Sequence, residues 1–482
     1  PYFILKSIIV NNLYGVDIME EAAEICRSRL FLKLMAQIER AEELPDLNIR
    51  VGNALVGYTE KCNPDFDRDQ LSRCLAGQYG NSIAYQKWLA SHKPFHWFIE
   101  FPDIMKRGGF DVIIGNPPYV EYRRIKQDYT VRGYETESCG SLYAFVMERS
   151  FALLQKNGVL GMIVPLSLVS TERMKPLQLL LNGVKRPICP GSRDNRTVWL
   201  SMYDVYPCKL FTGAKQRLCI AMVFAGTNGF KRPIYPEEED AAIFTTRYNR
   251  WKPEEREFLF QKLAYWESYY DHGFCAIPKL QDQLTENILR RMGNMKPAAF
   301  IEPVLQASFY MHQIPYNYIK AVDFVPYFWN EVDGRKKSVD YKSYCLARRE
   351  DARVILAALN SNLFFWWWHT LSDGYHCCRH EIYAFPIGLE EMSASHRDEL
   401  ARLADELMKD FIRNRRRRTC QYKSTGRVEY DEFYPRYSKP IIEEIDRVLA
   451  EHYGLTDEEL DFIINYDIKY RPSYSFLEVK LP

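Results

Sequence analysis

The sequence predicts an α/β fold, with a Rossmann-like sheet of mainly parallel strands followed by an α+β domain and terminal helices. Two apolar runs, residues 112–114 and 159–164, have the length and composition of strands buried on both faces of a parallel sheet. Stretches with apolar residues at helical spacing separate the strand candidates of the first half. Polar residues follow several of these strands, at the carboxyl ends where open α/β sheets bind ligands.

Composition places the chain among ordinary globular proteins. The 482 residues are 47% hydrophobic and 26% charged, and their number suggests two to four domains. A formal net charge of +1 excludes a uniformly basic nucleic-acid-binding protein, so any cationic surface must be local. The 12 cysteines lack paired spacing, and no signal peptide or membrane-spanning run is visible. We expect a cytoplasmic, prokaryotic protein without a membrane partner.

The first strands carry two candidate binding residues. Residues 4–10 read as a helix, and the strand that follows ends at Asp17-Ile18 before a helical pattern over residues 20–38. An acidic residue at such a position accepts hydrogen bonds from ribose hydroxyls, although Asp17 also suits a helix cap. The next strand, residues 48–51, ends in Gly52-Asn53-Ala54, where a polar ligand contact and a simple turn are both sound interpretations.

The strongest motif is Asn116-Pro117-Pro118-Tyr119, which follows the apolar run of residues 112–114 after Gly115. Two prolines stiffen the loop, and the carbonyl groups of Asn116 and Pro117 can accept hydrogen bonds from an exocyclic amino group. The ring of Tyr119 offers a face for stacking. This set suits a flipped-out purine or a planar amide, and the alternative is a Pro-Pro turn with a surface tyrosine.

Residues 109–120 resemble motif IV of the DNA N6-adenine methyltransferases, and are most similar to the long enzymes of type IIG restriction–modification systems. The resemblance implies methyl transfer from S-adenosylmethionine to a flipped adenine in a specific site of double-stranded DNA. It implies a methyltransferase sheet with catalytic residues at Asn116, Pro117, Pro118 and Tyr119. The implied cofactor contacts are Asp17 and Ile18 in motif II, Asn53 and Ala54 in motif III, and Asn116.

Later segments extend the resemblance. Residues 121–136 interleave rings with basic side chains, and a DNA-facing flap and a solvated loop are equally good interpretations. A helix over residues 141–156 and a strand over 159–164 are similar to motifs V and VI. We expect a hairpin from residues 208–211 and 217–224. By resemblance this is motif VIII, in which Phe211 stacks on the flipped base; a core role for Phe211 is the alternative.

The second half is expected to recognise the DNA target. The predicted domains are a catalytic domain over residues 1–235, a target recognition domain over 236–390, and a helical region over 391–482. A composition change at residues 230–240 marks the first boundary, and residues 248–270 read as helical. A charged helix is predicted over residues 395–418, followed by helices at 439–453 and, after a Thr456 cap, at 455–460. His376, Cys377, Cys378 and His380 lack zinc spacing, so no metal site is expected.

Some family features are missing from the sequence. The chain begins at Pro1, and the glycine-rich first motif, expected upstream of Asp17, is not present, so the chain reads as an N-terminally incomplete fragment whose sheet lacks its first edge. The remaining motifs follow the gamma order. The partners expected are DNA and a nuclease domain fused upstream or separate defence-system proteins. The alternatives are a DNA-binding fragment without cofactor binding and a protein glutamine methyltransferase, whose family shares the tetrapeptide.

Overall fold

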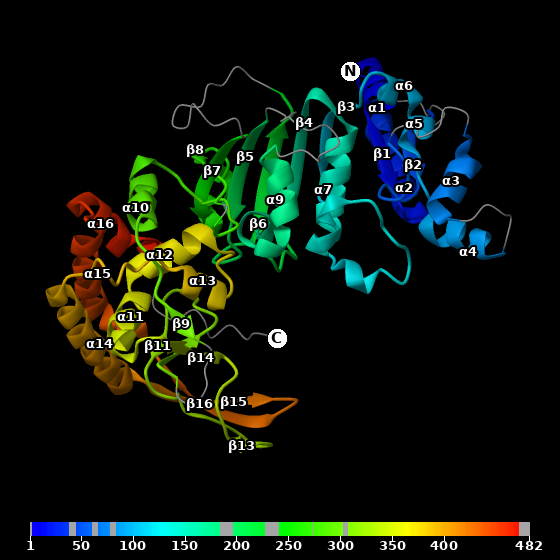
Figure 1. Cartoon of the computed structure of the whole chain (residues 1–482). Helices are drawn as coiled ribbons and strands as arrows, with labels where there is room; N and C mark the ends of the chain where they lie inside the picture. Colours follow the sequence, from blue (N-terminus) through cyan, green and yellow to red (C-terminus); the bar gives the residue numbers. More distant parts are fainter. Residues whose placement is uncertain are drawn as a thin grey trace. The chain divides into compact units, whose positions relative to one another are not determined.

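The computed structural model describes residues 2–37, 45–59, 66–77, 83–183, 196–226, 241–271, 273–301 and 307–471 (Figure 1). The chain divides into two compact units. The first unit contains Pro1–Pro165, Arg173–Trp199 and Ile220–Ala242, and the second contains Leu166–Glu172, Leu200–Cys219 and Ile243–Pro482. The predicted division into three domains stays a prediction, and its first boundary, at residue 235, lies outside the described residues.

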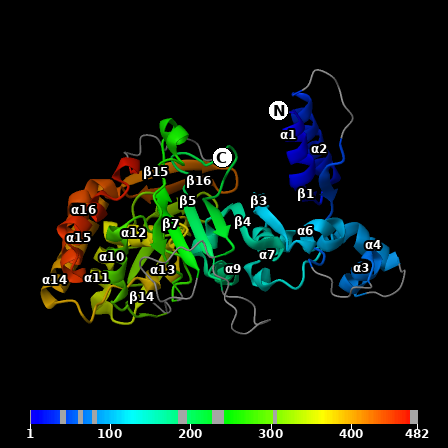
Figure 2. The same cartoon turned by 90° about the horizontal axis from the view of Figure 1, so that it is seen from above.

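The N-terminal part of the first unit alternates helix and strand as expected: α1 (Tyr2–Asn12), β1 (Tyr14–Asp17), α2 (Glu20–Met35) and β2 (Asn48–Val51). The strands β1 and β2 form a parallel pair in which Asp17 lies opposite Val51. Figure 2 shows β1 with α1 and α2 in blue. Tyr2 and Ile9 from α1 pack with Ala23 and Leu34 from α2 in a small apolar core beside this pair. The two strands therefore end at the same edge.

Four short helices connect this pair to the next strand: α3 (Arg68–Ala76), α4 (Ile83–His92), α5 (Trp97–Glu100) and α6 (Pro102–Lys106). Phe95, Trp97 and Phe101 from this connection form an aromatic cluster. Tyr14 of β1 contacts it, with its ring 5.1 Å from Phe101 and 5.7 Å from Phe110, the first residue of β3. The clustered rings thus form part of the core.

A six-stranded sheet has the order β3-β4-β6-β5-β7-β8. Its strands are β3 (Phe110–Gly115), β4 (Leu154–Pro165), β5 (Thr197–Tyr203), β6 (Leu218–Phe224), β7 (Ala242–Asn249) and β8 (Trp266–Ser268). The pair β3–β4 is parallel and the pair β7–β8 is antiparallel, so the sheet is mixed. The mixed α/β architecture is therefore as the sequence predicted.

The expectation that β3 is buried on both faces is wrong. Val112 is 59% exposed and Ile114 is 79% exposed, whereas Ile113, between them, packs against the aromatic cluster. The physical reason is that β3 is the terminal strand of its sheet and pairs only with β4. In strand β4, Leu160, Met162 and Val164 are buried in the core, whereas Val159 and Ile163 on the other face are half-buried.

Two other local predictions are also wrong. Residues 208–211 form no strand, because Arg217 donates a 3.0 Å hydrogen bond to the buried Asp204 and closes the intervening segment into an irregular loop. Strand β6 instead lies between β4 and β5. Residues 248–270 are not a helix. Strand β7 runs into this range, and Ile243 pairs with Ser268 of β8, so the backbone there is satisfied by sheet hydrogen bonds.

The second unit combines helices with two small sheets. The helices of its apolar core include α10 (Gln283–Gly293), α11 (Ala352–Leu359), α12 (Asn362–Leu371), α14 (Ala394–Asn414), α15 (Lys439–Tyr453) and α16 (Asp457–Asn465). The unit also contains α13 (Arg379–Ala384) and the 3-10 helix Pro253–Phe258. Every residue of α12 is buried. The helices α15 and α16 confirm the predictions for residues 439–453 and 455–460.

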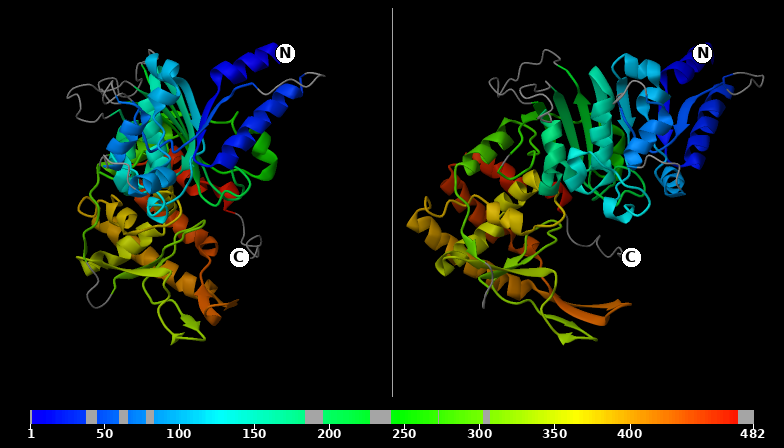
Figure 3. Two further views of the ribbon diagram at one scale, coloured as in Figure 1. Left: turned by 90° about the vertical axis from the view of Figure 1, so that its right-hand side faces the viewer. Right: turned by 45° about the vertical axis from the view of Figure 1, so that its right-hand side comes forward.

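One sheet of this unit has the order β11-β10-β14-β9 and the other β13-β12-β16-β15. Their strands are β9 (Phe300–Ile301), β10 (Phe309–His312), β11 (Ala321–Val322), β12 (Phe328–Asn330), β13 (Gly334–Arg335), β14 (Tyr341–Leu346), β15 (Arg416–Tyr422) and β16 (Gly426–Glu432). The predicted helix over residues 395–418 is therefore wrong at its end. Arg417 and Arg418 lie in β15, where each pairs with an acidic residue of β16 across the hairpin. Figure 3 shows this hairpin in orange.

Candidate active site

The loop that follows β3 is organised by the hydroxyl group of Tyr119. This hydroxyl lies 2.5 Å from Oδ1 of Asn116 and 3.0 Å from the backbone carbonyl of Ile163 on β4, and both oxygens accept its hydrogen. Burial raises the pKa of Tyr119 to about 12, so the phenol remains a donor at neutral pH. Tyr119 is half-buried, Asn116 and Pro118 are exposed, and Pro117 is buried.

This contact fixes the direction of the Asn116 amide. Its carbonyl oxygen accepts from Tyr119 and, having two lone pairs, keeps one for a further donor. The phenol is anchored on β4, so the strand holds the amide through the tyrosine. The structure thus brings together Asn116 and Tyr119, which the sequence predicted as partners in one site.

Asp17 ends β1 with its side chain exposed. Its Oδ1 accepts a 2.8 Å hydrogen bond from the backbone of Met19, the residue that caps α2, and its carbonyl accepts from Gly52 at the end of β2. The carbonyl of the next residue, Ile18, accepts from Nζ of Lys93 at 3.1 Å. Asp17 therefore shapes the turn into α2 while its carboxylate stays accessible.

Asn53 is only 3% exposed and lies just beyond β2. Its Oδ1 accepts a 3.1 Å hydrogen bond from the backbone of Leu55. Its Nδ2 is buried and has no hydrogen-bond partner among the residues that the structure describes. An unpaired buried donor is costly, so the amide nitrogen is free to bond an acceptor on a ligand. The neighbouring Ala54 accepts a 3.2 Å hydrogen bond from Nε1 of Trp97 through its carbonyl.

The loop that carries Asn53 is held by a residue that the sequence analysis did not single out. Arg149, on α7 (Leu142–Leu153), donates to the carbonyls of Leu55 at 3.1 Å and Gly57 at 3.0 Å. Its Nε donates to the hydroxyl of Tyr134, which itself donates to the Leu55 carbonyl at 2.8 Å. The available signal was a charged pair, Glu148-Arg149, inside an otherwise apolar helix.

The segment 121–136 places its rings inward and its cations outward. Tyr122 and Tyr134 pack with Leu142 and Phe145 in a core cluster, whereas Arg123, Arg124, Lys126 and Arg132 are exposed. Glu148 of α7 fixes the end of the segment by accepting hydrogen bonds from the backbone of Glu135 and Thr136. The aromatic residues therefore belong to the core, and the flap interpretation depends on the exposed cations alone.

The remaining predicted residues belong to other elements. Asp17, Asn53 and Asn116 all belong to the first unit, and β1 and β3 both contact the aromatic cluster, but no described backbone hydrogen bond joins these two strands. Phe211 is half-buried in the irregular loop between β5 and β6 and belongs to the second unit. Its role in base stacking stays a prediction.

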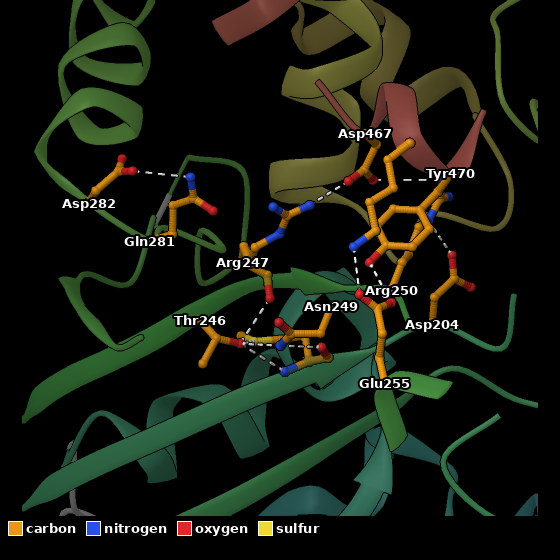
Figure 4. Close-up of polar contacts among 12 residues, drawn as sticks. Asp204, Thr246, Arg247, Asn249, Arg250, Glu255, Gln281, Asp282, Asp467 and Tyr470 are labelled. Atoms are coloured by element: carbon orange, nitrogen blue, oxygen red, sulfur yellow. Dashed lines mark hydrogen bonds and ion pairs between the residues drawn. The ribbon is translucent and has the colours of Figure 1, made fainter. Parts of the chain in front are cut away.

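The second unit contains a buried ion-pair network that was not predicted (Figure 4). Asp204 accepts from Nε of Arg217 at 3.0 Å and from Nε of Arg250 at 2.8 Å. Burial opposes ionisation of Asp204, but the charges of Arg250 and Arg217 outweigh it and hold its pKa below the ordinary value. Asp467 pairs with Arg247 and lies 3.6 Å from Nη1 of Arg250. Buried pairs of this kind position chain segments, and this network ties β7 to the end of the last helices.

Two further observations concern metal sites and membrane-spanning helices. No group of three or more His, Cys, Asp or Glu side chains in the described parts of the chain is placed to hold a metal ion. No described helix is both long and apolar enough to cross a membrane.

A mixed α/β sheet with polar loops at its strand ends has the architecture of the open-sheet α/β class, whose ligands bind at such ends. Within that class, residues 11–185 match the model of the Eco57I restriction-modification methylase family. This match includes the loop at Asn116 and confirms the predicted resemblance to restriction–modification methyltransferases over that part of the chain.

Two curated relatives agree with the match. A putative type II restriction enzyme and methyltransferase of Methanocaldococcus jannaschii is 25% identical over 274 residues, covering 36% of this chain and 23% of the relative. The type II restriction enzyme and methyltransferase RM.Eco57I of Escherichia coli is 26% identical over 196 residues, covering 37% of this chain and 16% of the relative. The chain thus spans less than a quarter of the length of either relative.

The solved structures found by comparison are more distant. The DrdV–DNA complex gives a TM-score of 0.43 at 10% identity, covering 98% of this chain and 63% of the other. A nuclease-deletion mutant of the Type ISP restriction-modification enzyme LlaGI with a DNA substrate mimic gives 0.38 at 13% identity, covering 76% and 27%. Likeness at this level carries no inference about function.

Proposed function

We propose that this chain belongs to a site-specific DNA adenine-N6 methyltransferase that acts in a restriction–modification or related phage-defence system. The observation that carries the proposal is the Asn116–Tyr119 loop, which follows a parallel strand inside the segment matched by the methylase family. The substrate is an adenine flipped out of double-stranded DNA into this loop.

Asn116 and Tyr119 divide the work of positioning. The free lone pair of Asn116 Oδ1, together with the Pro117 carbonyl, accepts the two hydrogens of the adenine amino group. These bonds draw the nitrogen toward a tetrahedral shape and localise its lone pair, which is otherwise conjugated with the ring. The tyrosine hydroxyl holds the amide, and its ring is available for stacking. No general base is required before the attack.

The residues at the ends of β1 and β2 fit the adenosine end of S-adenosylmethionine. The exposed carboxylate of Asp17 can accept from ribose hydroxyls, and the unpaired Nδ2 of Asn53 can donate to a ring nitrogen of adenine. When bound, this cofactor supplies an activated methyl group. Ile18 and Ala54 would line the same end through their backbones, which Lys93 and Trp97 already hold.

The decisive experiment compares Asn116→Ala with the control Asn12→Ala, which changes an exposed asparagine at the end of α1. Methyl transfer from radiolabelled S-adenosylmethionine to duplex DNA is followed in the protein that carries this chain, and the product is identified by mass spectrometry of nucleosides. Loss of one polar contact to the reacting group predicts a fall of about 100-fold for Asn116→Ala. Equal rates in both variants would contradict the assignment.

The same experiment distinguishes the alternatives. N6-methyladenine as product supports the proposal, whereas methylated glutamine in a protein substrate with unmodified DNA supports the glutamine methyltransferase. Calorimetry with S-adenosylmethionine tests the remaining alternative, a DNA-binding fragment that does not bind the cofactor. Specific DNA binding without any heat of cofactor binding would identify a recognition fragment, and in that case Asn53→Ala would change nothing.

A further inference from the structure

We propose that the hairpin of β15 and β16 is a contact surface for the phosphate backbone of double-stranded DNA. This inference rests on the proposed function, and it extends that function to a part of the chain expected to be helical. Residues 415–432 contain six cationic and three acidic side chains, in a molecule whose net charge is only +1. The hairpin therefore concentrates positive charge locally, as DNA binding by a nearly neutral protein requires.

One face of this sheet collects the relevant side chains. In antiparallel strands, residues directly opposite one another point to the same face. The pairs Arg417–Asp431, Thr419–Glu429 and Gln421–Arg427 place these residues together, and Trp329 of β12 lies opposite Glu429. Arg335 of β13 lies opposite Trp329 and joins the same face. On the other face Val428 is buried, whereas Arg416, Arg418 and Tyr422 are exposed.

The arginines of this face are stacked on aromatic rings. The guanidinium of Arg417 lies 3.5 Å from the ring centre of Tyr327, and Arg335 lies 5.3 Å from the same ring. Arg427 lies 5.1 Å from the ring centre of Trp329. Stacking restricts these long side chains before any ligand arrives, which lowers the entropy cost of binding, and the planar group retains donors at its edge for phosphate oxygens.

The acidic neighbours lie deeper than the arginines. The Arg417 side chain is 45% exposed against 10% for Asp431, its partner at 2.7 Å. The Arg427 side chain is 56% exposed against 27% for Glu429, at 3.5 Å. A ligand that approaches this face therefore meets guanidinium groups first, with Thr419 and Gln421 exposed between them as further donors.

The test measures the salt dependence of duplex binding. Each phosphate contact adds about 0.9 to the slope of log K against log salt. The double variant Arg417→Gln/Arg427→Gln should reduce the slope by about 1.8 for a mixed-sequence duplex oligonucleotide and lower the affinity about tenfold or more at moderate salt. The control is Arg402→Gln/Arg447→Gln, which removes two ion-paired arginines from α14 and α15 that are 57% and 48% exposed.

The outcomes separate this inference from the function on which it rests. A reduced slope in the hairpin variant only, with unchanged thermal unfolding, supports it. An equal change in both double variants would reveal a general charge effect and overturn it, as would no change in either. Arg417→Lys/Arg427→Lys keeps the charge and should recover most of the slope. Binding of no duplex by the unmodified protein would overturn the proposed function itself, whatever the variants do.

Discussion

The amide of Asn116 and the phenol of Tyr119 form one polar unit, because a single hydroxyl group joins the amide to the backbone of β4. The composition of the loop indicated both residues as site residues, but not that one orients the other. The proline pair predicts a stiff loop from local sequence alone. The carbonyl of Ile163 that holds the tyrosine hydroxyl belongs to a strand more than 40 residues later in the sequence. A contact of that range is invisible in a single sequence.

Tyr119→Phe should separate orientation from stacking. It removes both hydrogen bonds and keeps the ring, so we expect a fall in methyl transfer of about tenfold, the equivalent of about 1.4 kcal/mol. The measurement is a single-turnover rate at saturating DNA. Tyr129→Phe, which changes another half-buried tyrosine, is the control and should leave the rate unaltered. A normal rate in Tyr119→Phe would mean that the amide needs no anchor.

Asp446 on α15 should make stability depend on pH. Burial raises its pKa to about 7 from the ordinary value of 3.8, although Asn362 and the backbone of Leu363 donate to it. Because the folded state holds the proton more tightly, the contribution of Asp446 to the free energy of unfolding is complete below about pH 4 and is lost as pH rises through 7. Urea unfolding at several pH values should show this slope flattened in Asp446→Asn. Asp398→Asn, at an exposed position, should keep it.

At the scale of elements, the sequence predicted several strands and helices, because their signals are local. The strand β2 ends where the pattern ends, and α15 matches its predicted range. The failures have a common origin in tertiary pairing. Strand β3 would be buried on both faces only with a second neighbouring strand, which the described sheet does not contain. The arginine run lies in β15 and not in α14, because β16 offers acidic partners across the hairpin.

The edge position of β3 gives a contrast between two apolar substitutions. Ile114→Thr should change the free energy of unfolding by no more than about 0.5 kcal/mol, since this side chain is 79% exposed. Leu160→Ala, at a fully buried position opposite Ile113 on β4, should cost about 2–5 kcal/mol. Denaturant titrations of both variants check this, and a large loss for Ile114→Thr would show that another surface covers β3.

The cap of α16 is a second test at this scale. Thr456 accepts from the backbone of Glu459 at 3.2 Å, and Glu459 accepts in return at 2.8 Å, as the sequence predicted. Thr456→Ala should therefore lower the free energy of unfolding by about 1 kcal/mol. Ser424→Ala, at the exposed turn between β15 and β16, serves as the control. Equal stability of the two variants in urea would show that the cap contributes nothing.

At the scale of the molecule, the division into two units could not be read from the sequence, because segments of the second unit interrupt the first twice. Composition predicted several domains and a local cationic surface, but it did not indicate which residues form them. The network around Asp204 illustrates the limit: its arginines lie at 217 and 250 and join a carboxylate at 467, a set that no spacing rule connects.

The two units should unfold with separate signatures. Each has its own buried apolar clusters, and six of the nine tryptophans lie in the second unit: Trp251, Trp266, Trp329, Trp366, Trp367 and Trp368. Fluorescence therefore reports mainly on that unit, whereas circular dichroism reports on both. Phe411→Ala should shift the fluorescence midpoint, and Phe145→Ala should shift only the dichroism. Coincident midpoints in both variants would indicate a single cooperative transition.

The hydrogen bonds of Arg149 link two segments of the first unit, and this link has a consequence for ligand binding. One side chain bonds the loop that carries Asn53 and also Tyr134, at the end of the cationic segment 121–136. Anything that displaces the loop must then move or break the bond to the tyrosine. Thermodynamic reciprocity requires that whatever free energy this linkage transmits in one direction is transmitted equally in the other. Any factor by which a ligand at the Asn53 loop changes the affinity of segment 121–136 for a second ligand must therefore equal the factor measured in the opposite direction.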